Sequence, residues 1–166
     1  MHRSRPLASL AVAIVASACL DGAPFIPRIE DTNFDPSLGV DLAASTKTAS
    51  GVYYRDITVG TGPQVPADSG DTVFVRYTGY LRNAVVFDSN VDAVSPLRFV
   101  TGQREVIVGF EEGIYGILEG GQRQIIIPPL LAYGGSPPPG SGIPDYSILV
   151  FTVTVTRVGL LPDPTP

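Results

Sequence analysis

The sequence predicts an α+β fold, in which an antiparallel β-sheet accompanies one short α-helix. Two observations support this prediction. Several segments alternate apolar and polar side chains with a period of two, which is typical of antiparallel strands with one solvated face. One glycine-bounded stretch, residues 109–113, carries acidic residues after an aromatic one, as a short helix does near its first turn. With 166 residues, the chain has room for one domain with a sizeable core.

Four segments supply the expected strands. In the clearest of them Val73, Val75 and Tyr77 fall on one face, because side chains alternate along a strand. The four segments are residues 52–57, 71–81, 121–127 and 148–158. The last two, 121–127 and 148–158, are each expected to have one buried and one solvated face.

The expected helix follows the apolar run Val106-Ile107-Val108, which turns at Gly109. Glu111 and Glu112 suit the positive end of a helix dipole, and we expect both carboxylates to be solvated. Phe110 is expected to point inward. A strand that feeds a short helix through an aromatic side chain would form the floor of a pocket.

The first 18 residues have the three parts of a bacterial export signal: Arg3 and Arg5, an apolar run over 7–15, and small residues before Cys19. The apolar run is too short to span a bilayer. Cys19 is the only cysteine, at the position where a lipoprotein signal places its lipid-bearing thiol. We therefore expect an export signal over 1–18, a lipid anchor on Cys19, and a membrane-anchored protein in the periplasm or on the outer surface. Ordinary secretion with Cys19 as a free thiol is the alternative.

Composition divides the rest of the chain. Residues 19–50 carry scattered prolines and no sustained period, so we expect a tether, part of which lies across the domain as an extended arm. The domain is expected over 51–158 and a proline-rich tail over 159–166. Removing residues 1–18 leaves 9 basic and 16 acidic residues, a net charge of −7, which argues against nucleic acid as a partner.

The residue inventory excludes several kinds of chemistry. His2, the sole histidine, lies in the export signal, so a Ser-His-Asp triad is impossible. No metal-ligand cluster or glycine-rich phosphate loop with a lysine occurs, and we expect neither a metal nor a cofactor. Asp88, directly after Phe87, is a candidate site residue, although an Asx turn that closes the strand would explain it equally well.

Several motifs together resemble the FKBP-type peptidyl-prolyl cis-trans isomerases in order and spacing, over about residues 51–158. The resemblance implies a strongly curved antiparallel sheet, half-wrapped around one short helix, with an apolar pocket that accepts a proline ring. The motifs are Gly70-Asp71-Thr72-Val73, Tyr77-Thr78-Gly79, Phe87-Asp88-Ser89, the segment 102–113, Gly121-Gln122, Ala132-Tyr133-Gly134 and Leu149-Val150-Phe151.

The resemblance also implies roles for individual residues. The amide of Ile107 and the hydroxyl of Tyr133 would donate hydrogen bonds to the ligand, and the carboxylate of Asp88 would face a substrate carbonyl. The implied catalytic residues are Tyr77, Phe87, Asp88, Val106, Ile107, Phe110, Tyr133 and Phe151. The implied substrate-binding residues are Leu97, Phe99 and Ile143.

Some positions depart from the family's pattern. Phe110 stands where the best-known members carry tryptophan, Leu97 where an aromatic is usual, and Leu131 where tyrosine is common. Ala93 stands where the family often has an arginine that pairs with the pocket aspartate, so Asp88 is expected to be held by another donor, for which Tyr77 is the candidate. The loop after Tyr133 is one residue longer than in compact members. These departures imply weaker binding of the family's macrolide ligands.

The expected function is therefore isomerisation of X-Pro bonds in unfolded or folding envelope proteins, without a covalent intermediate. Its partners would be proline-containing polypeptides. A catalytically weak chaperone or proline-peptide-binding module of the same fold is the alternative. A structural envelope protein is a third, weaker possibility.

Overall fold

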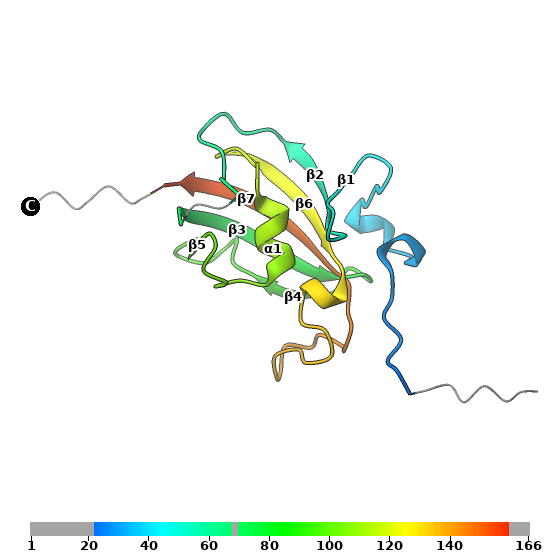
Figure 1. The fold of residues 1–166 in the computed structure, drawn as a ribbon. Helices are drawn as coiled ribbons and strands as arrows, with labels where there is room; N and C mark the ends of the chain where they lie inside the picture. Colours follow the sequence, from blue (N-terminus) through cyan, green and yellow to red (C-terminus); the bar gives the residue numbers. More distant parts are fainter. Residues whose placement is uncertain (1–21, 68–69, 160–166) are drawn as a thin grey trace, which may run out of the picture.

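The computed structural model describes residues 22–67 and 70–159 (Figure 1). The expected export signal over 1–18, the lipidation site Cys19 and nearly all of the tail over 159–166 lie outside the described residues. Within the described ranges, the helices are too short or too polar to cross a membrane.

Seven strands form one antiparallel sheet in the order β1-β2-β6-β7-β3-β4, and β5 also pairs with β3. The predicted α+β class, a curved antiparallel sheet with one short helix, is confirmed (Figure 1). The strands are β1 (Thr46–Lys47), β2 (Tyr53–Thr58), β3 (Thr72–Leu81), β4 (Val86–Ser89), β5 (Leu97–Val100), β6 (Gln122–Ile127) and β7 (Leu149–Val158). The helical elements are α1 (Val108–Ile114) and the 3-10 turns η1 (Ile29–Asp31), η2 (Pro36–Leu38) and η3 (Pro129–Leu131).

Helix α1 lies directly on β6, on the face of the sheet that we call the inner face. Two glycines allow this close approach: a Cβ atom added at Gly109 or at Gly113 would lie 2.3 Å from Cγ2 of Ile127 or of Ile125. The main core fills the space between helix and sheet, and Phe110 points into it as expected. The largest fully buried side chains on this face include Val73, Val75, Phe99, Ile114, Ile117, Ile125, Ile127 and Leu149.

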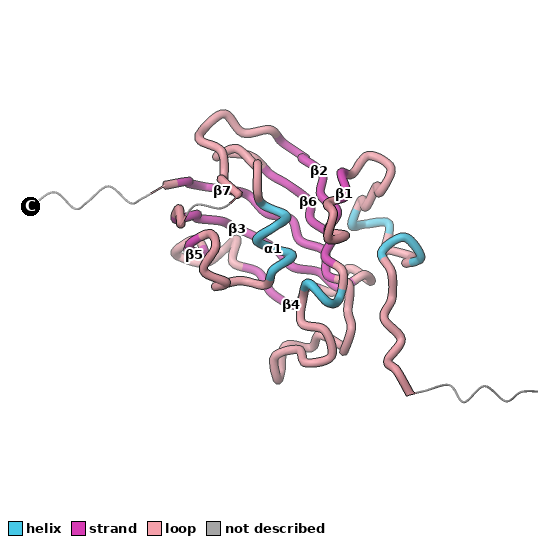
Figure 2. The backbone as a smooth tube through the Cα atoms, viewed as in Figure 1, coloured by secondary structure: helices cyan, strands magenta, loops and turns pink. Residues whose placement is uncertain are grey.

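A second core lies on the opposite, outer face of the sheet, under residues 29–42, which we call the arm. Figure 2 shows the arm as loop interrupted by two short helical turns. Its apolar side chains cover Ile126 and Val150, whose neighbours on the inner face belong to the main core. The residues of this second core are Ile29, Tyr53, Ile126, Ile148 and Val150, with Phe34, Leu38, Val40, Leu42 and Tyr80 packed against them.

The arm covers a strand face that the sequence analysis expected to be solvated. Residues 121–127 were expected to have one solvated face, but Gln124 is 5% exposed and Ile126 is 1% exposed. Strand β6 is therefore buried on both faces. The alternation of side chains along the strand is as expected, but the chain's own arm replaces water on the outer face.

Polar contacts fix the arm at several points. Nε2 of Gln124 donates to the Leu38 carbonyl at 2.7 Å, and Nη2 of Arg55 donates to the Gly39 carbonyl at 2.9 Å.

The Glu30 carboxylate accepts from Nζ of Lys47 at 2.6 Å and from the Tyr53 hydroxyl at 2.8 Å. These donors lower the pKa of Glu30 from 4.5 to about 2, the bond from Lys47 having the largest effect. Residues 29–42 thus pack against the domain as an extended arm.

Candidate functional site

Five aromatic rings meet on the inner face, each from a different element. Phe110 of α1 lies with its ring centroid 5.1 Å from that of Phe151 on β7 and 5.8 Å from that of Tyr77 on β3. Phe87 of β4 packs edge-on against Phe151 at 5.5 Å, and Phe99 of β5 lies 6.2 Å from Phe110. Edge-to-face geometry is favourable for aromatic pairs. Phe99, Phe110 and Phe151 are buried, whereas Tyr77 and Phe87 are partly exposed.

The aliphatic residues implied by the resemblance lie around this cluster of rings. Ile143 is buried in the same core. Leu97, Val106, Ile107 and Tyr133 are partly buried and pack against it. The structure thus brings together ten of the eleven implied site residues in one core, and the eleventh, Asp88, is joined to it by Tyr77.

Asp88 is exposed on β4, where it is held by the donor that the sequence indicated. The Tyr77 hydroxyl donates to Oδ2 of Asp88 at 2.5 Å. Burial, together with this bond to a carboxylate, raises the pKa of Tyr77, so the phenol stays protonated and donates at neutral pH. The alternative of an Asx turn does not hold, because the Asn90 amide N–H donates to the Tyr77 carbonyl at 3.0 Å instead.

The loop that follows β4 is held by two residues that the sequence did not single out. Nη1 of Arg76 donates to the carbonyls of Asn90 at 2.7 Å, Val91 at 3.2 Å and Ala93 at 2.8 Å. The Asn90 side chain accepts from the Tyr77 amide at 2.7 Å and donates to the Val75 carbonyl at 3.1 Å. Arg76 and Asn90 therefore fix the backbone on either side of the Tyr77–Asp88 bond. Neither residue carries a signal in the sequence, because the carbonyls and amides that they contact lie many positions away along the chain.

Two hydrogen-bond donors at the site have no acceptor among the residues that the structure describes. One is the amide of Ile107, the residue before α1, whose φ of −62° and ψ of 144° are extended. The other is the hydroxyl of Tyr133. Burial, and then the charge of Asp88, raise the pKa of Tyr133, so its hydroxyl also stays protonated. Both donors are available to a ligand carbonyl.

Glu111 corrects the expectation that both helix acids are solvated. Its side chain is 6% exposed, and its carboxylate accepts from the Gly102 amide and, at 3.0 Å, from the Tyr115 hydroxyl. The physical reason is that the loop before α1 supplies the Gly102 amide as a donor, and Tyr115, directly after the helix, supplies its hydroxyl. Glu112 is partly exposed and accepts from the Ser50 hydroxyl at 2.6 Å.

A buried arginine secures the other end of α1. Arg123 on β6 is 3% exposed and pairs through Nε with Asp56 at 2.6 Å. Its Nη1 donates to the carbonyls of Gly113 at 3.0 Å and Tyr115 at 2.8 Å, at the C-terminal end of the helix. The guanidinium also lies over the Tyr54 ring, 4.3 Å from its centroid. Arg123 therefore fixes the helix that carries Phe110.

The comparisons with known proteins agree with this geometry. The sequence model of the FKBP-type peptidyl-prolyl cis-trans isomerase family matches residues 64–156. "FK506-binding protein 4" of Chaetomium thermophilum is 43% identical over 123 residues, 74% of this chain and 23% of the relative. "FK506-binding protein 3" of Yarrowia lipolytica is 46% identical over 108 residues, 65% of this chain and 25% of the relative. The chain thus spans about a quarter of the length of these relatives.

Two solved structures are similar over most of the described chain. FkpA from Escherichia coli has a TM-score of 0.61 and 37% identity, covering 70% of this chain and 52% of FkpA. AtFKBP13 has a TM-score of 0.61 and 35% identity, covering 68% of this chain and 97% of AtFKBP13. The family match covers more than half of the 166 residues and includes the elements that carry the five rings. The chain belongs to the FKBP-type peptidyl-prolyl cis-trans isomerase family.

Proposed function

We propose that this chain accelerates cis-trans isomerisation of X-Pro bonds in unfolded or folding proteins of the cell envelope, without a covalent intermediate. The observation that carries the proposal is the cluster of five rings, bordered by two unpartnered donors and one carboxylate. Such a surface offers an apolar contact for a proline ring and polar contacts for its neighbouring carbonyls.

Rotation about a peptide bond needs no proton transfer. Its barrier, roughly 18–20 kcal/mol, comes from amide resonance, and the unaided X-Pro step takes tens of seconds. Twisting the bond abolishes resonance and leaves a less polar amide, so an apolar environment disfavours the planar ground state relative to the twisted one. A rate increase of about four decades requires roughly 5.5 kcal/mol. Desolvation, shape and a few oriented donors can supply an effect of that size.

The residues would divide this work. Phe110 would form the floor under the proline ring, and Phe151, Phe87 and Tyr77 its walls. The Ile107 amide and Tyr133 hydroxyl would hold substrate carbonyls, and Asp88, fixed by Tyr77, would face the twisting bond. The apolar surroundings favour an apolar residue before proline.

An assay with a proline-containing tetrapeptide tests the proposal. Wild type should accelerate isomerisation, and Tyr133→Phe should lower kcat/KM about tenfold, the equivalent of one hydrogen bond of about 1.4 kcal/mol. Tyr80→Phe is the matched control, since Tyr80 packs on the outer face. A wild-type rate equal to that in buffer, with aggregation of an unfolded protein still suppressed, would favour the chaperone alternative.

We also propose that the chain is exported and anchored by lipid on Cys19, on the basis of its N-terminal pattern. Intact mass of the mature protein tests this, because cleavage before Cys19 and lipid additions change the mass in defined ways. A mature N-terminus elsewhere, or an unmodified Cys19, would contradict it.

The names of the relatives favour FK506-type macrolides as further ligands, which this chain would bind with reduced affinity because Phe110 lacks an indole N–H.

A further inference from the structure

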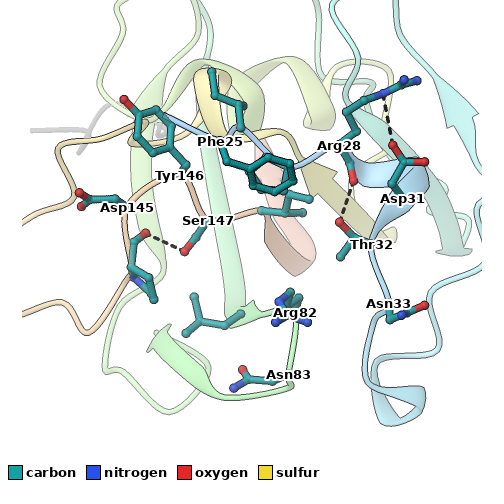
Figure 3. Close-up of a pocket in the computed structure, with 15 residues that line it drawn as sticks. Phe25, Arg28, Asp31, Thr32, Asn33, Arg82, Asn83, Asp145, Tyr146 and Ser147 are labelled. Carbon is teal, nitrogen blue, oxygen red and sulfur yellow. Dashed lines mark hydrogen bonds and ion pairs between the residues drawn. The ribbon is translucent and has the colours of Figure 1, made fainter. Parts of the chain in front are cut away.

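A pocket lies outside the aromatic cluster, between the N-terminal segment and the rest of the domain (Figure 3). Its volume is about 630 Å³. Three segments line it: residues 25–28 and 31–33 on one side, residues 81–83 at the end of β3 and in the turn after it, and residues 144–148 before β7. In Figure 3 the Phe25 ring lies at the centre of this pocket, with Tyr146 and Arg82 at its borders.

The lining combines apolar surface with charges of both signs. Phe25 is 86% exposed although it is a large apolar residue, and Ile26 beside it is also exposed. Within the described residues, neither Arg82 nor Asp145 has an ion-pair partner. The pocket thus offers an aromatic ring, a free cation and a free anion to a ligand.

This pocket adjoins the core of the proposed isomerase site. Ile143, which belongs to the core of that site, is followed directly by the lining residues Pro144 and Asp145. The amide of Tyr146 donates to the Gly134 carbonyl at 2.7 Å, next to Tyr133. Leu81 lines the pocket and packs against the same core as the five rings. The pocket and the core of the isomerase site therefore share Leu81, and residues 143 and 144 join them along the chain.

We propose that this pocket binds the part of the client polypeptide that flanks the X-Pro bond, as an extension of the proposed isomerase site on which the proposal rests. An unfolded polypeptide carries apolar side chains and charges of both signs, as the lining requires. The chain's net charge of −5 disfavours nucleic acid there. The five steps from Ile143 to Ile148 span at most about 18 Å, a distance that about five extended client residues would cover.

Peptides of two lengths test the proposal. A tetrapeptide centred on Leu-Pro fills only the isomerase site, whereas a peptide of about sixteen residues with the same centre reaches the pocket. Wild type should show a KM at least about threefold lower for the long peptide, because the second contact adds binding energy. Equal KM values for the two peptides would overturn the proposal.

Variants locate the second contact. Phe25→Ser should raise the KM of the long peptide to that of the tetrapeptide and leave tetrapeptide turnover unchanged. Arg82→Glu should act in the same direction on a long peptide with acidic flanks. Val59→Ser is the matched control, since Val59 is also an exposed apolar residue but lies after β2, outside the pocket lining. A Phe25→Ser enzyme that keeps the low KM would contradict the assignment.

A long peptide with alanine in place of proline separates this proposal from the isomerase function. Fluorescence anisotropy should detect its binding to wild type and at least about threefold weaker binding to Phe25→Ser. If wild type fails to turn over either peptide but this difference persists, the isomerase function fails and the pocket stands. If wild type forms a dimer in sedimentation that Phe25→Ser dissolves, the pocket binds a second copy and the client proposal is wrong.

Discussion

The two faces of the sheet differ in what their side chains contact, although the same strands supply both. On β7, Phe151 points to the inner face and joins the aromatic cluster, while its neighbour Val150 points to the outer face and lies under the arm. Around Ile126 and Val150 the outer face is covered by the arm, whose carbonyls accept side-chain hydrogen bonds from Arg55 and Gln124. The inner face keeps Tyr77, Phe87 and Tyr133 partly exposed, with donors that the described chain does not use.

This difference separates stability from function. A face that is covered by the chain's own side chains contributes to folding and leaves less surface for a ligand. A face that leaves rings and donors exposed gives up some stability and can bind. Changes on the outer face should therefore alter unfolding, and changes around the inner cluster should alter activity, unless they release helix α1.

The largest effect is expected where a buried charge supports α1. Arg123→Met should lower the free energy of unfolding by about 3–5 kcal/mol, since two helix carbonyls and Asp56 lose their donor. Arg55→Met on the outer face should cost only about 1 kcal/mol, because its guanidinium donates to the Gly39 carbonyl alone. Urea unfolding measures both. A larger loss for Arg55→Met would reverse the comparison.

The next effect is expected under the arm. Ile29→Ala should lower the free energy of unfolding by about 2 kcal/mol, because it empties a buried position in the outer core. The kcat/KM for a tetrapeptide should stay unchanged, since the inner face is not touched. Thermal unfolding and the tetrapeptide assay together check this. A parallel fall in kcat/KM would show that the two faces are coupled.

A smaller, functional effect is expected at Arg76. Arg76→Met should lower kcat for the tetrapeptide about fivefold, because the loop over 90–93 loses its three carbonyl bonds and the Tyr77–Asp88 pair loses its support. Arg76→Lys should recover most of the activity, since an ammonium can donate to the same carbonyls. Equal kcat for Arg76→Met and wild type, at matched stability, would exclude a positioning role.

Phe110 sharpens the comparison within the inner face. Phe110→Trp should tighten FK506 binding by about threefold to tenfold, through an added N–H donor and larger contact area. Turnover of the tetrapeptide should change less, because in the proposed function the smaller proline ring would already rest on phenylalanine. Titration calorimetry measures the affinity. Equal affinities for wild type and variant would contradict the role given to this residue.

The smallest effect is expected at the edge of the arm and depends on pH. The folded pKa of Glu30, about 2, lies below its ordinary value of 4.5, so its contribution to stability is present above pH 4.5. That contribution is lost as the pH falls toward about 2, because the carboxylate is protonated and releases Lys47 and Tyr53. Thermal midpoints should therefore drop less between pH 5 and 2 in Glu30→Gln than in wild type. Identical pH profiles would show that the lowered pKa does not contribute.

The sequence predicted the inner face better than the outer. Period-two alternation located β3, β6 and β7, and the acidic stretch after Phe110 located α1. The family's motifs then assigned the ring residues, which the structure brings together. Asp88 was assigned to Tyr77 because the expected arginine is replaced by Ala93, and the structure shows that bond.

The misses have a common physical cause. Alternation shows that a strand has two faces but not what covers each, so polar Gln124 indicated water where the arm lies. Glu111 has the composition of a solvated helix start, but the folded loop at Gly102 brings a donor to it. Arg76 acts on carbonyls more than ten positions away. Contacts between distant segments leave no local pattern in a single sequence.

The two glycines beneath α1 have a consequence for how this domain can vary. Because Gly109 and Gly113 rest on the methyl groups of Ile127 and Ile125, the height of the helix above the sheet is set by backbone and not by residue 110. The side chain at position 110 can therefore change, in evolution or by design, without displacing the helix that carries it. If the proposed function holds, substitution at 110 would tune ligand preference, whereas alanine at either glycine would raise the whole helix above the sheet.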